Sequence, residues 1–225
     1  MENYYYSTES TRSVSLVKVF GYMFLGLLIS ALSAIGVYYL LLTGVINLNS
    51  YGGITIISSI ALIILVFVAQ FYCLKNKTGG LVVYSLYALT MGILLSSFMI
   101  IYSISFLGYV FLCTAGSFGI MALYGLLTKR STLSLGMFGV GALFGILTLS
   151  LVNIFLQSEP IYYLISYIGL AAMLAITAFD IQRAKQLANS GSLTEGLAIY
   201  MALQLYTDFI YIFIRLVSIL ARNRR

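Results

Sequence analysis

The chain has 225 residues, of which 61% are hydrophobic and only 8% are charged, and its formal net charge is +6. Soluble domains are about half apolar and about a quarter charged, so a soluble fold could not bury this much apolar surface. The chain has no histidine, which excludes histidine-based metal sites and catalytic triads that need one. The composition predicts an integral membrane protein.

Seven apolar runs are long enough to cross a bilayer, whose hydrocarbon core takes about 20 residues of helix. The short connections leave no room for an extramembrane domain. We therefore predict a cytoplasmic N-terminal tail at 1–13, one all-α transmembrane domain at 14–221 and a basic C-terminal tail at 222–225. The runs are Val14–Thr43, Gly53–Leu74, Gly79–Tyr102, Ile104–Leu127, Leu133–Gln157, Ile161–Lys185 and Leu193–Ala221.

Basic residues occur in alternate connections and thereby predict the orientation. They precede the first run and follow the second, fourth and sixth, whereas the other three connections contain none. This positive-inside pattern places the N-terminus in the cytoplasm. It also favours two separate runs around the weak break at Tyr102 and Ser103, where a merger would leave six helices. Seven crossings put Arg222 outside, against the rule, so a last segment that re-enters without crossing is the alternative.

Only two of the six acidic residues, Asp180 and Asp208, fall well inside predicted helices. A carboxylate at the centre of a membrane helix costs about 2.5–3.5 kcal/mol, so one that remains there usually has a function or a partner. Asp208 is expected near mid-depth, with Arg215 about 10 Å further along the same face. A structural hydrogen bond or ion pair between helices is the alternative. The other acidic residues fall in loops or tails: Glu2, Glu9, Glu159 and Glu195.

Asp180 is expected near the cytoplasmic end of the sixth span, where an interfacial ion pair with Arg183 is one interpretation. The sixth helix is longer than the hydrocarbon core, so a tilt would bring Asp180 inward towards the last helix. If Asp180 and Asp208 meet, the two carboxylates cannot both ionise cheaply and would share a proton as one titrating unit. Such a pair would be a proton-sensitive latch and a weak, transient site for a hard cation.

Glycines on the fifth run predict close packing between helices. Gly141 and Gly145 form a GxxxG step, and Gly136 and Gly139 precede it. This spacing usually marks close helix contact in membranes. We expect the contact to lie within the chain rather than between two copies.

Three motifs occur in order along the chain. The first is TAGSFGIMALYG at 114–125 with TKR at 128–130, the second is FDIQ at 179–182, and the third is LYTDFI at 205–210 with FIRL at 213–216. They resemble the fourth-span, sixth-span and last-helix signatures of the Bax inhibitor-1 family, the transmembrane Bax-inhibitor-motif proteins. The resemblance covers essentially the whole chain.

The resemblance implies a bundle of seven transmembrane helices with the C-terminal helix at its centre, in a bacterial plasma membrane. It implies a pH-sensitive calcium leak channel rather than an enzyme. Asp180 and Asp208 would be its pH sensor and ion pathway, and would hold calcium weakly while it is transported, without a cofactor. Arg215, Gln182 and Lys75 are candidates for supporting roles. Some family members carry a basic latch near the end of the second span, which here is either displaced to Lys75 or missing.

The expected partners are calcium ions, protons and the lipid bilayer. Nucleic acid is not expected, because the basic residues form no continuous face. The alternative function is a non-conducting membrane regulator or interaction protein, acting in a stress response or on a membrane protease. An intramembrane aspartyl protease is disfavoured, because Leu205, Tyr206 and Thr207 stand before Asp208 where presenilin-like enzymes carry Gly-x-Gly.

Overall fold

The computed structural model describes residues 15–222, and these form seven α-helices without a strand. All seven are long and apolar enough to cross a membrane, which confirms the predicted fold. The predicted tail at 1–13 and the last three residues of the predicted C-terminal tail lie outside the described residues. The helices are α1 (Leu16–Leu42), α2 (Leu48–Lys75), α3 (Lys77–Ile101), α4 (Ile104–Leu127), α5 (Leu133–Leu156), α6 (Glu159–Asn189) and α7 (Glu195–Arg222).

The weak break after α3 is a true helix boundary. Tyr102 ends α3 in an extended conformation, and Ser103 begins α4 as its N-cap, with the serine side chain accepting a hydrogen bond from the Phe106 N–H at 3.3 Å. A serine at this position satisfies a helix N–H that would otherwise lack a partner. The alternative of six helices is therefore wrong.

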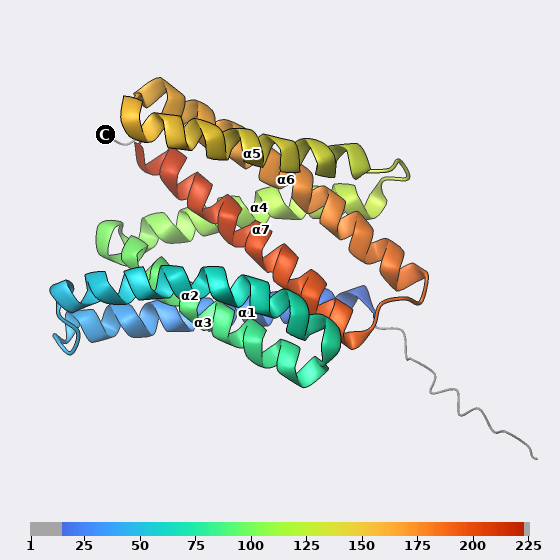
Figure 1. Ribbon diagram of the computed structural model, residues 1–225, viewed down its shortest axis with the longest axis horizontal. Coiled ribbons are helices and arrows are strands. Elements are labelled where there is room, and N and C mark those ends of the chain that lie inside the picture. Colours follow the sequence, from blue (N-terminus) through green and yellow to red (C-terminus); the bar gives the residue numbers. More distant parts are fainter. Residues whose placement is uncertain (1–14, 223–225) are drawn as a thin grey trace, which may run out of the picture.

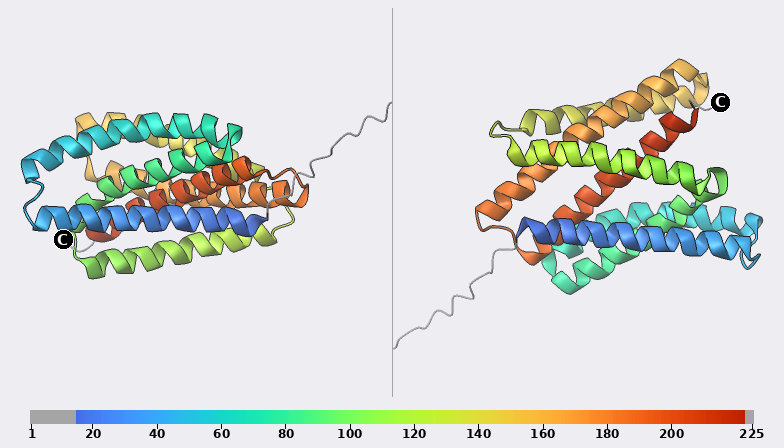
Figure 2. Two further views of the ribbon diagram at one scale, coloured as in Figure 1. Left: turned by 90° about the horizontal axis from the view of Figure 1, so that it is seen from below. Right: turned by 180° about the vertical axis from the view of Figure 1, so that it is seen from behind.

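The last helix lies at the centre of the bundle. In Figure 1, α7 runs diagonally between a group formed by α1, α2 and α3 and a group formed by α4, α5 and α6. It packs against every helix of both groups except α5, which packs chiefly on α6. Two further views show the same arrangement (Figure 2). Because α7 is continuous over 28 residues, it is a crossing helix rather than a re-entrant segment.

Glycines allow the helices of each group to approach closely. A Cβ atom at Gly26 in α1 would lie 2.0 Å from the Tyr84 hydroxyl of α3, and one at Gly125 in α4 would lie 2.6 Å from the Ala178 carbonyl oxygen of α6. These positions therefore leave no room for a side chain. Large apolar side chains such as Phe155 and Leu127 instead cover the outside of the bundle, where lipid is the solvent.

The glycines of α5 divide into two pairs. Cβ atoms at Gly136 and Gly139 would lie 2.6 Å from the Phe179 ring and 2.5 Å from the Ile176 side chain of α6, so these two make the close contact. Gly141 and Gly145 have no such neighbour within 4 Å. The expectation that the GxxxG step makes a close contact within the chain is therefore wrong, because this face of α5 turns away from α6.

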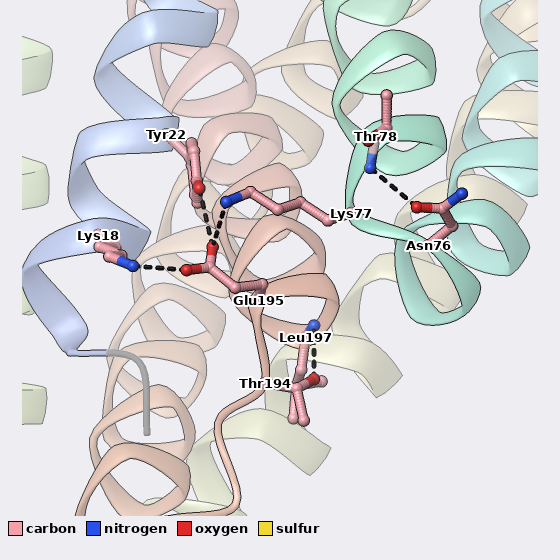
Figure 3. Close-up of polar contacts among 8 residues, drawn as sticks. All are labelled: Lys18, Tyr22, Asn76, Lys77, Thr78, Thr194, Glu195 and Leu197. Carbon is pink, nitrogen blue, oxygen red and sulfur yellow. Dashed lines mark hydrogen bonds and ion pairs between the residues drawn. The ribbon is translucent and has the colours of Figure 1, made fainter. Parts of the chain in front are cut away.

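The two ends of the bundle are fastened by carboxylates at helix starts. Glu195, the first residue of α7, pairs with Lys18 of α1 and Lys77 of α3 and accepts a hydrogen bond from the Tyr22 hydroxyl at 2.9 Å (Figure 3). At the opposite end Glu159, the first residue of α6, pairs with Arg222 of α7. Both glutamates thus open helices, which corrects their assignment to loops. We call the end with Glu195 the basic end and the end with Glu159 the far end.

Candidate functional site

The fold brings Asp180 and Asp208 to similar depths on neighbouring helices. The α6 and α7 helices are joined by a short turn in which Gly191 takes a positive φ of 70°, a conformation that glycine adopts without strain. Asp180 lies nine residues before the end of α6, and Asp208 lies thirteen residues after the start of α7. At 1.5 Å per residue they lie about 14 Å and about 20 Å from the basic end. Because α6 and α7 pack antiparallel, two residues that are 28 positions apart in the sequence lie near each other in the bundle.

Both aspartates are buried. Asp180 is 5% exposed and Asp208 is 4% exposed. The charge of Asp180 acts on Asp208, and the Thr177 hydroxyl of α6, which donates a hydrogen bond to the Met173 carbonyl oxygen at 2.8 Å, also lies beside Asp208. The Oδ2 atom of Asp208 has no hydrogen-bond partner among residues 15–222. Two like-charged groups, one with a free oxygen, thus occupy one site in the apolar interior.

No direct ion pair neutralises the two aspartates within the described chain. The three ion pairs there involve Glu195 and Glu159 only. Arg183, one turn after Asp180 on α6, acts on Asp180 through its charge. Lys75, a candidate for a supporting role, is exposed at the end of α2 and is not part of these pairs. The site therefore carries two carboxylates with one cation nearby.

A cavity of about 610 Å³ adjoins Asp180 and opens towards α5. Gln204 of α7 and Arg183 also line it. The Oε1 atom of Gln204 is buried without a hydrogen-bond partner in the described part of the chain. Sequence reasoning missed this glutamine, although its position one helical turn before Asp208 places both on one face of α7. Thr177 was missed in the same way, one turn before Asp180.

Gln182 has a structural contact set that the sequence did not predict. Its side-chain oxygen accepts hydrogen bonds from the backbone N–H and the hydroxyl of Thr132, both at 2.8 Å. Its side-chain nitrogen donates to the Arg130 carbonyl oxygen, also at 2.8 Å. Gln182 thus fastens the connection between α4 and α5 to α6, two residues from Asp180.

Arg215, the third candidate for a supporting role, lies far from the aspartates. Its Nη2 atom donates a hydrogen bond to the Tyr211 hydroxyl at 2.6 Å. Its guanidinium also stacks on the Tyr211 ring, 5.0 Å from the ring centre. Seven residues of helix, about 10 Å, separate it from Asp208. Its contacts define a separate polar position in the far half of α7.

The geometry suits proton sharing and brief cation contact. Two neighbouring carboxylates in a low-dielectric interior favour one shared proton over two charges. When both are ionised, their oxygens match the ligand preference of a hard cation. The described residues contain no cluster of three or more Asp, Glu, Cys or His side chains. The arrangement therefore offers fewer ligands than the six to eight oxygens of a tight calcium site.

Fold and site together define a polytopic membrane protein with a buried acidic pair at its centre. The chain belongs to the Bax inhibitor-1 family, because residues 12–225 match the family model described as "Inhibitor of apoptosis-promoting Bax1". It is 33% identical over 222 residues to the inner membrane protein YbhL of Escherichia coli K12. This match covers 93% of this chain and 92% of YbhL.

Two further relatives come from other bacteria. A membrane protein of Streptococcus pyogenes serotype M3 is 34% identical over 163 residues, or 72% of this chain and 71% of the relative. A protein of Borreliella burgdorferi is 31% identical over 220 residues, which make up 93% of this chain and 92% of the relative. The similarity to two of these relatives thus spans nearly the whole bundle.

Proposed function

We propose that the protein is a pH-sensitive calcium leak channel controlled by the Asp180–Asp208 pair. One observation carries the proposal: two buried carboxylates interact across α6 and α7, and one of their oxygens has no protein partner in the described chain. A charge at this depth is costly unless it serves a pathway or a partner. A pair that takes up either a proton or a passing cation accounts for that cost.

The same pair sets the direction of the pH response. When the pair holds a shared proton, a hydrogen bond links α6 to α7 and the site carries at most one negative charge. When that proton leaves, two negative charges repel each other in a medium of low dielectric constant. That repulsion favours either separation of the helices or the arrival of a cation. Calcium flux should therefore increase as pH rises.

The cavity beside Asp180 supports an approach from the basic end. It is lined by α5, α6 and α7, and its unpartnered Gln204 oxygen lies one turn from Asp208. A carbonyl oxygen next to carboxylates adds a further ligand of the kind that calcium prefers. Such a small ligand set binds weakly, and conduction needs weak binding.

We further propose that the basic end faces the cytoplasm of a bacterial cell. The distribution of lysine and arginine supports this orientation, and one relative is an inner membrane protein of Escherichia coli. Seven crossings then place the C-terminus outside. An alkaline phosphatase fused to the C-terminus should be active, and a green fluorescent protein fused there should be dark. The opposite pair of results would reverse the orientation.

Calcium flux in liposomes tests the channel proposal. The purified protein is reconstituted with a calcium-sensitive dye inside, calcium is added outside, and the initial rate is recorded at a series of pH values. The wild type should conduct increasingly as pH rises, and Asp208→Asn should lose this dependence. Glu195→Gln is the matched control, because it removes an acidic charge from the same helix outside the site.

Two outcomes would contradict the proposal. The first is a wild-type rate equal to that of protein-free liposomes at every pH, together with a stoichiometric protein partner after purification. That result would favour the non-conducting regulator. The second is an unchanged pH response in Asp208→Asn, which would leave conduction without a role for the aspartate pair.

A further inference from the structure

A groove runs between α5 and α7 on the outside of the bundle. The cavity beside Asp180 and a second cavity of about 420 Å³ share Val140 and Phe144 as lining residues. The second cavity reaches Ser150 of α5 and Tyr211 and Arg215 of α7. Because α5 packs chiefly on α6, its side towards α7 is left open. We call the second cavity and its walls the α5–α7 groove.

Arg215 is the charged group of this groove. Its guanidinium lies against Gly169 of α6, where a Cβ atom would be only 3.1 Å from Nε. Its guanidinium donates a hydrogen bond to the neutral Tyr211 hydroxyl. The ion pairs of residues 15–222 use Lys18, Lys77 and Arg222 as their cations. Arginine stays charged in proteins, so Arg215 brings a positive charge to an apolar wall without a carboxylate partner there.

Arg215 lies inside the bundle, below the headgroup region of the far end. It lies seven residues, or about 10 Å, before Arg222 at the far end of α7. Arg222 pairs with Glu159 and lies 4.1 Å from the centre of the Tyr162 ring. Tyrosine and arginine together are typical of the membrane interface. A long arginine side chain just below this level can reach the phosphates of lipids.

The walls below Arg215 are apolar. Leu143, Phe144 and Leu147 of α5 line the groove at the depth of the acyl chains. A free anion would gain nothing from these walls, whereas a lipid would place its phosphate at the charge and its chain along them.

We propose that the α5–α7 groove binds an anionic phospholipid of the leaflet at the far end. The phosphate contacts the Arg215 guanidinium and the Tyr211 and Ser150 hydroxyls, and one acyl chain lies along α5. Charge-assisted hydrogen bonds from arginine to phosphate give the headgroup contact its strength. The site is independent of ion conduction, since it uses neither aspartate.

Lipid retention tests this site. The protein is purified in a mild detergent, incubated with phosphatidylglycerol or phosphatidylcholine, and analysed by native mass spectrometry. The wild type should retain about one phosphatidylglycerol per chain in preference to phosphatidylcholine. Arg215→Gln should lower this retention about tenfold or more, because it removes a charge-assisted contact. Arg222→Gln removes the same charge from the same helix, but next to Glu159, and should retain the lipid.

A second pair of variants tests the acyl-chain wall without touching the arginine. Leu147 lines the groove and Leu151 does not, although they are 58% and 56% exposed on the same helix. Leu147→Trp should lower lipid retention, and Leu151→Trp should not. Equal retention by wild type and Arg215→Gln, or equal retention of the two lipids, would overturn the proposal. Thermal stabilisation by inorganic phosphate alone, at the same level as by phosphatidylglycerol, would also overturn it.

Discussion

Gln182 and Gln204 both lie between the aspartate pair and the basic end but have opposite surroundings. Gln182 has partners for both polar atoms of its side chain, in Thr132 and Arg130. Gln204 has a buried oxygen without a partner among residues 15–222. A buried polar atom that lacks a partner is costly and usually has a functional reason. The first glutamine is thus a structural anchor, and the second is a candidate ligand for a cation that passes the site.

This contrast predicts different costs for the same substitution. Gln182→Leu leaves the Thr132 N–H and the Arg130 carbonyl without their partner and should lower the free energy of unfolding by about 1–3 kcal/mol. Gln204→Leu removes an oxygen that bonds to nothing in the described chain and should cost clearly less. Thermal unfolding in detergent measures both. Equal losses would show that Gln204 is also structural.

At the scale of whole helices, glycine contacts hold α5 to α6. Gly139 lies on the contact face, where a Cβ atom would be 2.5 Å from Ile176 and 2.9 Å from the Ala172 carbonyl oxygen. Gly141, two residues later, has no such neighbour within 4 Å. The side chain of isoleucine can shift, but the carbonyl oxygen belongs to the backbone of α6 and cannot. Close packing by small residues is a main source of helix association in membranes.

Two alanine substitutions test this contact face. Gly139→Ala should lower the free energy of unfolding by about 1–3 kcal/mol, because it forces α5 away from α6. Gly141→Ala adds the same methyl group on the same helix in open space and should leave the unfolding midpoint unchanged or raise it. Thermal unfolding in detergent compares the two. A larger loss at Gly141 would place the close contact on the other face of α5.

At the scale of the whole molecule, the number and limits of the helices follow from local properties of the sequence. Apolar runs longer than the hydrocarbon core form helices because lipid leaves no other partner for their backbone groups. The break at Tyr102 and Ser103 was predicted from the basic-residue pattern, and the structure adds the Ser103 cap that begins α4. Even so, α2 begins at Leu48, five residues before the predicted Gly53, because Tyr51 is buried and hydrogen-bonds to Ser96 at 2.8 Å.

The resemblance predicted the central place of α7, but the side-chain contacts between helices could not be predicted from the sequence. The motifs indicated that Asp180 and Asp208 are functional residues. A spacing of 28 residues, however, does not determine whether the two side chains meet, because that depends on how α6 packs against α7. Gln182 shows the same limit. Its partners, Thr132 and Arg130, lie about 50 residues away in the connection between α4 and α5, and only the packed bundle brings them together.

The most direct measurement of the proposed mechanism is calcium flux against pH for four proteins: the wild type, Asp180→Asn, Asp208→Asn and the double variant. If the two carboxylates act as one titrating unit, the wild-type rate rises with pH, each single variant loses that rise, and the double variant behaves like either single one. A double variant that combines two separate effects, or a wild-type response in either single variant, would contradict control by a shared proton.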